Sequence, residues 1–512
     1  MAGSEVSKDT YEYSYMPTRL GYNPVSATYN NGFYPSDYNN NTNNMKGDML
    51  FGKQPTYLGS ISYGNNYGVR DNRFVSWYGN GSYEYNNRYI LTGSVRLDLT
   101  NFFGTDPKYR YKPTWSVGGT WKLSNENFFS GLKDIFNRLN IRASYGVNGN
   151  ISLSYTPYLI LSVGSHNPTT GGVSYGISSY PNNQLRWERT GIFDVGLDAS
   201  LFENRLNISF DYYNKKSTDL IVSDSIDETK GTTAIPQNVG GVTNQGFEIT
   251  LNADVIKGKQ FSWNSNLITS YNTSNVDYYN VKRAYFGSYA TASSILVQGY
   301  PMNGFWGAKF AGLDNKGTAL FYNHNGEKVE GGSLEADDAI YLGTYRPKVD
   351  MSWTNTFSYK NFDLSFMFIG KFGHKYRKDC FSGSNYNSRY VGQRWKQAGD
   401  EEKTIYPVLK SWNMDMFYFP YSDILVGNAN YVKLRDLTLS YNLPKSVLKS
   451  IKLSSAKIYF QTRNLFYITA KGVDIDPETA ELNASGTGAM TAQAYTSLQL
   501  RPEFYFGVMI NL

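Results

Sequence analysis

The feature that most constrains this chain is the alternation of apolar and polar residues at every second position along most of its length. In FDVGLDASLFENRLNISFDYY, Val195 and Leu197 alternate with Asp194 and Asp198, and the same order resumes after a tight turn at residues 203–205. Successive side chains of a β-strand point to opposite faces of the sheet. The pattern therefore predicts a hairpin with one apolar and one polar face.

Several other stretches repeat this alternation, and the composition agrees with it. They are YILTGSVRLD, LNIRASYGV, GFEITLNADVIKGKQFSWNSNLITSY, VDMSWTNTFSYKNFDLSFMFIGKF and the closing LRPEFYFGVMINL. The chain holds 45 Tyr, 29 Phe and 48 Gly, and these residues favour strands and turns over helices. We therefore predict an all-β fold.

Short and long connections alternate strictly between the predicted strands. The short ones lie near Glu84–Asn87, Ser124–Arg138, Phe202–Arg205, Ile256–Gln260, Lys360–Asn361 and Leu443–Ser455. The long ones are roughly Leu99–Thr114, Asn148–Thr190, Asn214–Gln245, Asn272–Lys348, Gly373–Asn430 and Asn464–Pro502. Soluble sandwiches and propellers have no need to keep their long loops at one end. Outer-membrane barrels do so, with short turns facing the periplasm.

This order predicts a transmembrane antiparallel β-barrel with long extracellular loops. Counting from a first strand at Pro55–Tyr63, we expect about fourteen strands, an even number as in bacterial barrels. The closing strand, which ends at Leu512, is then a wall strand whose apolar face meets lipid. We expect the loops Asn272–Lys348 and Gly373–Asn430 outside the cell.

The same alternation assigns faces to the hairpin that starts at Phe193. The side chains expected to face lipid are Val195, Leu197, Leu201, Leu206, Ile208 and Phe210. Those expected to face the lumen are Asp194, Asp198, Asn207 and Asp211.

Composition also excludes several classes of protein. The mean hydropathy is −0.47 and no apolar run approaches the roughly 18 residues of a membrane helix. The net charge of +6 is spread without a basic block, which argues against nucleic acid as a partner. With one cysteine, Cys380, and three scattered histidines, neither a disulfide nor a zinc site is indicated, and we expect no cofactor. The opening MAGSEVSKDTYEY has no basic or apolar signal region, so the chain is cytosolic, processed or part of a longer protein.

Two groups of residues are candidates for binding. Trp306, Trp395 and Trp412 lie in long loops, where an indole can stack on a sugar ring or a peptide side chain, or serve as a membrane anchor or in loop packing. The carboxylates of GVDIDPETAE, at positions 474, 476 and 478, suit calcium, but loop chemistry around Pro477 explains them more simply. We therefore predict no metal site.

No catalytic constellation stands out. The sequence has no Ser-His-Asp order, no Gly-rich phosphate loop and no fixed carboxylate spacing of a glycosidase. We therefore expect a protein that is not an enzyme.

Beyond these patterns, a series of segments resembles the SusC/RagA-type TonB-dependent transporters of Bacteroidetes. The segments are YNNRYILTGSVRLD, LNIRASYGVNGN, LRWERTGIFDVGLDASLFENRLNISFDYYNKKSTDLI, NQGFEITLNADVI, QRWKQAGDEEKTIYP, NYVKLRDLTLSYNLPKSVL, and RNLF followed by GVDIDPE. The chain departs from the family in DLTNFFG, where members carry a DGSSRFG-like stretch, and at Ala398, where they carry a proline.

The resemblance implies a location in the outer membrane and TonB-dependent uptake of a large nutrient, either a glycan or a peptide fragment. It also implies a SusD-like surface lipoprotein as partner, contact with membrane lipid, and contact with TonB through an N-terminal plug. Such transporters have a barrel of about 22 strands, and no signal peptide, TonB box or plug is recognisable here. We therefore interpret residues 56–512 as the C-terminal portion of a larger barrel, and residues 1–55 as a polar Tyr/Asn-rich extracellular loop.

Two other functions remain open at this point. One is a surface barrel that does not transport, such as an adhesin or a passive pore. The other, which the sequence favours less, is a secreted β-rich carbohydrate enzyme.

Overall fold

A computed structural model describes most of the 512 residues. The described residues are 1–15, 66–101, 106, 108, 111–150, 152, 155–166, 169, 172–279, 285–291, 296–378, 380, 388–410, 413–450, 453–473, 475, 476, 478 and 500–511. No helix among them is long and apolar enough to cross a membrane.

The main sheet of the described residues has 14 strands, in the order β1-β2-β3-β4-β5-β8-β9-β10-β11-β17-β18-β21-β22-β23. Its strands are β1 (Ala2–Tyr15), β2 (Asn66–Tyr85), β3 (Tyr89–Thr100), β4 (Thr114–Lys122), β5 (Phe136–Asn150), β8 (Glu188–Leu201), β9 (Leu206–Ser225), β10 (Ala234–Lys257), β11 (Phe261–Tyr278), β17 (Val349–Tyr359), β18 (Phe362–Phe372), β21 (Tyr431–Asn442), β22 (Ser455–Thr469) and β23 (Glu503–Asn511). The order is linear, with β1 and β23 at its two ends. The predicted all-β fold and the count of about fourteen strands are confirmed.

The chain divides into two compact units. The smaller one contains Gly3–Trp77 and Asp98–Phe102, and the larger one contains Met1–Ala2, Tyr78–Leu97 and Phe103–Leu512.

In the smaller unit, β1 corrects one expectation. Residues 1–55 were expected to form a loop, yet Ala2–Tyr15 is a strand that pairs with β2. Lys8 and Arg73 both approach Asp71 Oδ2, at 3.5 and 2.7 Å. The segment was misread because it is polar on both faces, whereas backbone pairing to a neighbour does not depend on side-chain polarity. The first strand expected at Pro55–Tyr63 lies outside the described residues.

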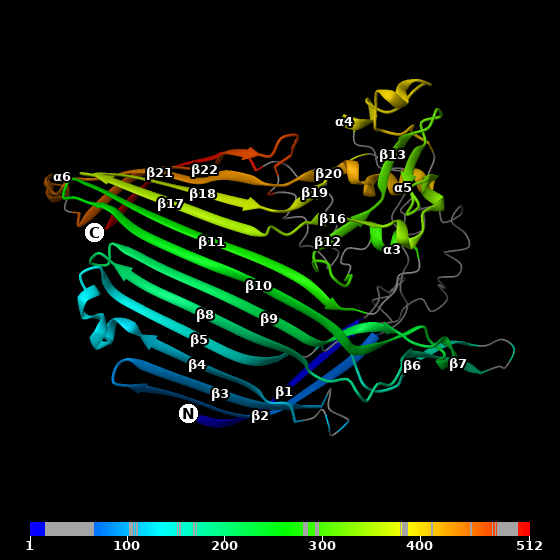
Figure 1. Cartoon of the computed structure of the whole chain (residues 1–512), viewed down its shortest axis with the longest axis horizontal. Helices are drawn as coiled ribbons and strands as arrows, with labels where there is room; N and C mark the ends of the chain where they lie inside the picture. Colours follow the sequence, from blue (N-terminus) through cyan, green and yellow to red (C-terminus); the bar gives the residue numbers. More distant parts are fainter. Residues whose placement is uncertain are drawn as a thin grey trace, which may run out of the picture. The chain divides into compact units, whose positions relative to one another are not determined.

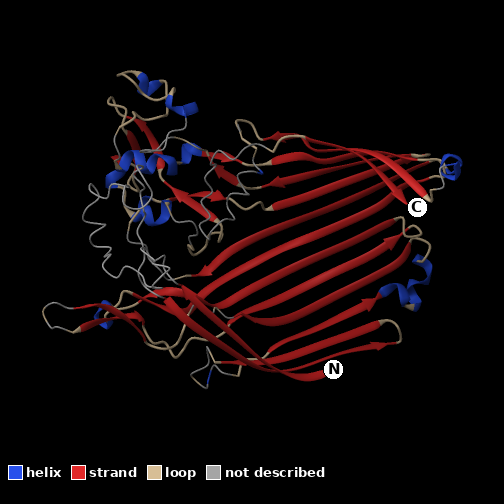
Figure 2. Ribbon diagram, turned by 180° about the vertical axis from the view of Figure 1, so that it is seen from behind, coloured by secondary structure: helices blue, strands red, loops and turns tan. Residues whose placement is uncertain are grey.

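In the larger unit, neighbouring strands are antiparallel and their short connections lie together at one end, with the long ones at the other (Figures 1 and 2). Asn86 and Asn87 join β2 to β3 with positive φ angles of 50° and 54°, the backbone of a tight hairpin turn. The short-turn end also carries the helix α6 (Lys445–Ser450) and the 3-10 turns η2 (Leu123–Asn125) and η3 (Asn127–Leu132). The predicted separation of short from long connections is confirmed.

One predicted long loop is mostly strand. Residues Asn214–Gln245 were expected to be loop, but β9 continues to Ser225 and β10 begins at Ala234, in unbroken antiparallel contact apart from two bulges. The 3-10 turn η4 (Glu228–Lys230) lies in the remaining connection. The extended part carries polar residues on both faces, so no apolar face marks it in the sequence.

The strand register sorts the side chains of the sheet into two faces. Ile141, Leu197, Phe210 and Ile249 are cross-strand neighbours in one row on β5, β8, β9 and β10. The adjacent row, one residue along each strand, contains Arg142, Gly196, Asp211 and Glu248. We call these the apolar face and the polar face. The ten residues predicted to divide between lipid and lumen separate in this way.

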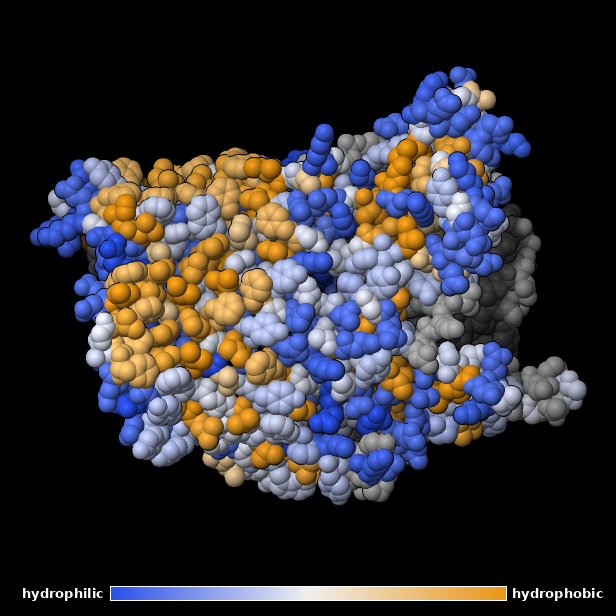
Figure 3. Space-filling model, viewed as in Figure 1, coloured by the Kyte–Doolittle hydropathy of each residue, from blue (hydrophilic) through white to orange (hydrophobic). Residues whose placement is uncertain are grey.

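The apolar face is exposed rather than packed. The exposed fraction reaches 75% for Phe506 and 62% for Phe504 on β23. Aromatic rings meet across strands on this face, as in the stacked series Phe210, Phe247 and Tyr271. Figure 3 shows apolar residues gathered over the strands, mainly toward the short-turn end, with hydrophilic residues prevailing at the loop end. An exposed apolar surface of this size indicates contact with a nonaqueous medium.

The long connections contain secondary structure of their own. Its strands are β6 (Ile160–His166), β7 (Val173–Ser179), β12 (Gly304–Gly307), β13 (Lys309–Leu313), β14 (Ala319–Tyr322), β15 (Lys328–Glu330), β16 (Ile340–Thr344), β19 (Lys375–Arg377) and β20 (Val426–Asn428). Its helices and 3-10 turns are α3 (Gly287–Ala290), η5 (Gly331–Ser333), η6 (Ala336–Asp338), α4 (Ser388–Val391), η7 (Asp400–Glu402), α5 (Met414–Tyr418), η8 (Phe419–Tyr421) and η9 (Asp423–Leu425).

Candidate functional site

The polar face of the sheet carries charges that are paired across strands. Arg142 on β5 lies between Asp198 on β8 and Asp211 on β9, with N–O distances of 3.0 and 2.8 Å. Ser209 Oγ also donates a hydrogen bond to Asp198, at 2.9 Å. Gly196 leaves room for this cluster, because a Cβ there would lie 2.5 Å from the Arg142 guanidinium carbon. A bulkier residue in this place would displace the arginine.

The same face continues as a hydrogen-bonded polar surface over the later strands. Asn264 on β11 donates to Asp254 on β10, at 2.9 Å. Farther along the sheet, Gln461 on β22 donates to Asp436 on β21, at 2.7 Å. Because these groups stay half-exposed and hydrogen-bonded, the polar face is suited to a water-filled space.

The two longest loops fold together into one compact body, which we call the loop subdomain (described residues within 285–345 and 374–429). Its buried core draws on both loops and consists of Phe286, Ala290, Ala308, Ala319, Phe321, Leu334, Tyr418, Phe419 and Leu425. The backbone N–H of Ala308 donates to the Tyr421 carbonyl at 3.1 Å, and the N–H of Asp423 donates to the Ala308 carbonyl at 3.0 Å. The sequence alone did not relate the two loops to each other, although GFWGAKFAGL in the first and MFYFPYSDIL in the second both carry a cluster of apolar residues.

Arg377 on β19 joins the two loops from inside this body. Its guanidinium lies 5.3 Å from the ring centre of Phe305 and 4.7 Å from that of Tyr421, and it donates to the Trp306 carbonyl at 3.0 Å. Burial lowers the pKa of Arg377 to about 10. The side chain therefore remains cationic at neutral pH and contributes cation–π contacts to both loops.

A second polar contact orders the turn between β14 and β15. The His324 ring and backbone both contact Asp338 Oδ1, at 2.8 and 2.6 Å. The hydrogen bond to Asp338 raises the pKa of His324. Burial opposes ionisation of Asp338, but the backbone N–H of Glu335 and the contacts with His324 hold the pKa of that carboxyl below its usual range. Asp338 is therefore an anion that closes the turn.

The structure places the predicted tryptophans in different environments. Trp306 is 6% exposed and is surrounded by Tyr289, Tyr300 and Tyr341, so its indole packs within the loop subdomain. Trp395 is half-buried; its indole N–H donates to Glu401 Oε2 at 2.9 Å, and its ring covers Gly317. Trp412 lies outside the described residues. The two described tryptophans thus have separate surroundings, with tyrosine rings around Trp306 and with Glu401 and Gly317 beside Trp395.

Acidic residues of GVDIDPETAE form ion pairs with basic residues of β21. Lys433 on β21 is fully buried, and its ammonium lies 3.1 Å from Asp476 and 2.7 Å from Glu478. Arg435, at a bulge in the pairing of β21 with β22, also contacts Glu478. Two of the carboxylates that were considered as calcium ligands, Asp476 and Glu478, therefore bind a lysine side chain. Asp474 lies outside the described residues, and no group of three or more metal-binding side chains forms among the described ones.

The sequence did not reveal this cluster, because Asp476 and Glu478 lie 43 and 45 residues after Lys433. The signal in the sequence was YVKLRD, where Lys433 and Arg435 are like charges two residues apart on a strand whose other face is apolar. Such a pair needs carboxylates from elsewhere in the chain if it is to be buried.

Comparison with known proteins identifies the class. A family model described as "TonB dependent receptor-like, beta-barrel" matches residues 4–465. This chain belongs to that family, whose members are outer-membrane β-barrels. The exposed apolar face of the sheet therefore meets lipid, and the polar face lines the lumen.

Two curated relatives illustrate the likeness. TonB-dependent receptor P26 of Formosa agariphila is 30% identical over 457 residues, which cover 83% of this chain and 44% of the relative. TonB-dependent receptor SusC of Bacteroides thetaiotaomicron is 26% identical over 432 residues, which cover 80% of this chain and 41% of the relative. The chain thus spans less than half the length of these relatives.

Among solved structures, the RagAB peptide importer in its open-open state has a similar fold. The TM-score is 0.70 at 22% identity, and the match covers 91% of this chain and 49% of that one. The predicted resemblance to SusC/RagA-type transporters, the barrel fold and the outer-membrane location are confirmed.

Proposed function

We propose that this chain is the C-terminal part of the barrel of a transporter that takes up a large nutrient, a glycan or a peptide fragment. In this proposal a SusD-like surface lipoprotein docks on the loop side, and TonB acts through the plug of the full-length transporter. The observation that carries the proposal is the two-faced sheet, which has a hydrogen-bonded polar face for an aqueous lumen and a folded loop subdomain at one end. The relatives named TonB-dependent receptors support it, and a peptide as cargo agrees with the similarity in fold to the RagAB peptide importer.

For the substrate contact, Trp395 is the favoured candidate of the three tryptophans. It keeps part of its indole accessible, and the hydrogen bond to Glu401 holds the ring in place. The buried ring of Trp306 has little surface to offer.

Uptake by the full-length parent tests the transport proposal. A strain that lacks the whole gene is grown on panels of oligosaccharides and of peptides as limiting nutrients, beside a strain complemented with the intact gene. Loss of growth on one member of either panel, restored by the intact gene and abolished again by deletion of TonB, is the expected result. Unchanged growth on every nutrient contradicts energised uptake.

The alternatives give different results. If the protein is a passive pore, it conducts ions in planar bilayers without TonB. If it is an adhesin, deletion of the gene reduces the attachment of cells, while growth is unchanged and the protein shows no conductance. The carbohydrate enzyme has no support among the relatives, which are named as receptors.

The side of the membrane on which the loop subdomain lies is a separate part of the proposal. Gly326 forms the exposed tip of the turn between β14 and β15, with open space around it. An epitope tag inserted there in the full-length parent is expected to be labelled on intact cells. A matched tag between Lys360 and Asn361, in a short turn, is expected to be labelled only after permeabilisation. The reverse pattern contradicts the topology.

A further inference from the structure

The short-turn end of the larger unit divides into two halves that differ in charge. The first half consists of the connections from β2 to β3, from β4 to β5 and from β8 to β9. These connections comprise residues 84–88, 122–138 and 202–205. They contain five basic and four acidic side chains. Charges of opposite sign are paired here, since Arg88 lies 3.2 Å from Glu126 and Lys122 lies 2.6 Å from Glu84.

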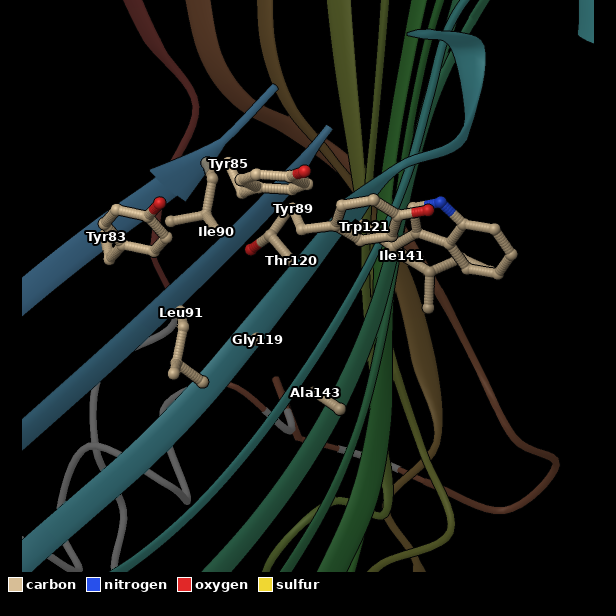
Figure 4. Close-up of a pocket in the computed structure, with 10 residues that line it drawn as sticks. All are labelled: Tyr83, Tyr85, Tyr89, Ile90, Leu91, Gly119, Thr120, Trp121, Ile141 and Ala143. Atoms are coloured by element: carbon tan, nitrogen blue, oxygen red, sulfur yellow. The ribbon is translucent and has the colours of Figure 1, made fainter. Parts of the chain in front are cut away.

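Glu126 of this half is fully engaged within the protein. The rings of Tyr89 and Trp121, which line the apolar hollow drawn in Figure 4, donate from Oη and Nε1 to one oxygen of Glu126. The two distances are 2.5 and 3.0 Å. Arg88 donates to the other oxygen at 3.2 Å. The first half of the short-turn end is therefore close to neutral.

The second half is basic and consists of the connections from β10 to β11, from β17 to β18 and from β21 to β22. These connections comprise residues 254–264, 357–365 and 440–458. They contain seven lysines and two aspartates. Neighbouring turns are in contact, because the backbone N–H of Lys360 donates to the Gln260 carbonyl at 2.9 Å. The N–H of Asn442 donates to the Asn361 carbonyl at 2.8 Å. The three turns thus form one surface, which includes α6 in Figure 1.

Five of these lysines are exposed, and we call them the lysine rim. They are Lys257, Lys259, Lys360, Lys445 and Lys449. None of the five forms an ion pair with a carboxylate of the described residues. Lys445 and Lys449 are four residues apart on α6 and therefore project from the same side of that helix. Of the other two lysines, Lys457 is half-buried and Lys452 lies outside the described residues.

The two aspartates of these turns are engaged elsewhere. Asp363 lies 3.8 Å from Lys457 and accepts a hydrogen bond from Asn442 at 2.8 Å. Asp254 accepts a hydrogen bond from Asn264 at 2.9 Å. The lysine rim therefore carries a positive charge that these aspartates do not neutralise.

A row of aromatic rings lies beside the lysine rim on the apolar face. The rings are cross-strand neighbours at the ends of four strands and belong to Phe261, Tyr359, Phe362 and Tyr441. Tyr359 is 51% exposed and Phe362 is 50% exposed. Such rings mark the membrane–water interface of a barrel. Figure 3 shows hydrophilic residues just beyond the apolar ones at this end. The lysine ammonium groups therefore lie at the level of the lipid head groups.

We propose that the lysine rim binds anionic glycerophospholipids of the surrounding leaflet through their phosphate groups. Neighbouring cations at a membrane surface attract anionic head groups additively, whereas a zwitterionic lipid has no net charge to attract. A lipid is the source of the phosphate because the rings beside the lysines are exposed on the face that meets lipid.

The short turns of bacterial barrels face the periplasm, so these lipids belong to the inner leaflet. The inference requires the outer-membrane barrel but not transport. Its tests measure lipid binding alone, so their failure would leave the proposed function untouched.

Three quadruple variants of the full-length parent test the proposal. The rim variant carries Lys259→Gln, Lys360→Gln, Lys445→Gln and Lys449→Gln. The control variant loses the same charge at exposed lysines of the long connections, through Lys230→Gln, Lys316→Gln, Lys328→Gln and Lys396→Gln. The arginine variant has Arg at the four rim positions and keeps their charge. Equal heat-modifiable mobility of all the proteins shows that each barrel is folded.

The readout is native mass spectrometry of the detergent-extracted proteins with an equimolar mixture of palmitoyl-oleoyl phosphatidylglycerol and palmitoyl-oleoyl phosphatidylethanolamine. We expect the wild type, the control variant and the arginine variant to retain at least fivefold more phosphatidylglycerol than phosphatidylethanolamine. The rim variant should retain the two lipids equally. Equal retention by the wild type, an unchanged preference in the rim variant, or a lost preference in the control or arginine variant overturns the proposal.

Two further measurements distinguish the lipid from other anions. Addition of 1 mM glycerol phosphate should leave the retained phosphatidylglycerol unchanged, and its displacement would assign the lysine rim to a soluble phosphate and overturn the proposal. The detergent-solubilised protein should not sediment with purified peptidoglycan. Sedimentation that the rim variant loses would assign the rim to the cell wall and also overturn the proposal.

Discussion

Apolar side chains are exposed on the 14-stranded sheet, whereas they are buried in the loop subdomain. On the sheet, Phe506 is 75% exposed, whereas in the loop subdomain Phe321 and Phe419 are fully buried. The polar groups are reversed as well, since the sheet keeps its ion pairs on the face opposite its apolar residues. One chain therefore folds against two media, with lipid around the strands and water around the loops.

Lys433 is a fully buried side chain on a face of the sheet whose other charged groups are half-exposed or exposed. In its burial it resembles the core residues of the loop subdomain. Lys433→Met leaves Asp476 and Glu478 without their ammonium, and we expect a loss of about 3–5 kcal/mol in the free energy of unfolding. Urea titration of the reconstituted full-length protein measures it. The control is Lys457→Met, whose lysine is 39% exposed and 3.8 Å from Asp363; it should cost less than about 1 kcal/mol. Equal effects of the two changes would contradict the assignment of a buried cluster.

Phe419 tests whether the loop subdomain has a core of its own. Phe419→Ala removes a fully buried ring, and we expect a cost of about 3–5 kcal/mol confined to the loops. Limited proteolysis of the reconstituted protein should cut the loop subdomain faster, while heat-modifiable mobility of the barrel stays unchanged. The control is Phe506→Ala on the apolar face, which should leave loop proteolysis as in the wild type. Loss of the barrel in Phe419→Ala would show that the two regions are not separable.

Adjacent residues on β10 compare the two faces of the sheet at one depth. Ile249 lies on the apolar face and Thr250 on the polar face. Ile249→Arg places a charge in lipid and should cost about 2–4 kcal/mol near the middle of the membrane. Thr250→Arg should cost little, because its side chain reaches the lumen. The measurement is the amount of heat-modifiable barrel in the outer membrane, and equal amounts for the two variants would refute the face assignment.

The smallest expected effect is a pH dependence at the base of the loop subdomain. His374 is buried beside Tyr431, and burial, with the nearby Lys371, lowers its pKa to about 4. The unfolded histidine binds a proton at its usual pKa of about 6.5, whereas the folded one does not. Stability should therefore fall by about 1–3 kcal/mol as the pH drops from 6.5 to 4, and then level off.

Hydrogen exchange of the loops across this pH range measures the effect. His374→Gln removes the titrating ring and should flatten the slope between pH 6.5 and 4. A slope that persists in this variant would assign the acid sensitivity to another group.

The sequence alone determined the features that repeat locally. Alternation along FDVGLDASL and RLNISFDY was enough to place Val195 and Ile208 on one face and Asp194 and Asp211 on the other. The reason is that the side-chain period of a strand is set by its own backbone. The order of short and long connections likewise needed no knowledge of the partners, and together with the alternation it predicted the barrel.

Only the tertiary structure decided the features that depend on a distant partner. The strand Ala2–Tyr15 and the extension of β9 to Ser225 exist because a neighbouring backbone pairs with them, not because of an apolar face. The burial of Trp306 and the pairing of Lys433 with Asp476 also require segments that are far apart in the chain. In each case the stabilising contact forms between residues that no local pattern relates, so its energy enters only when the fold has brought them together.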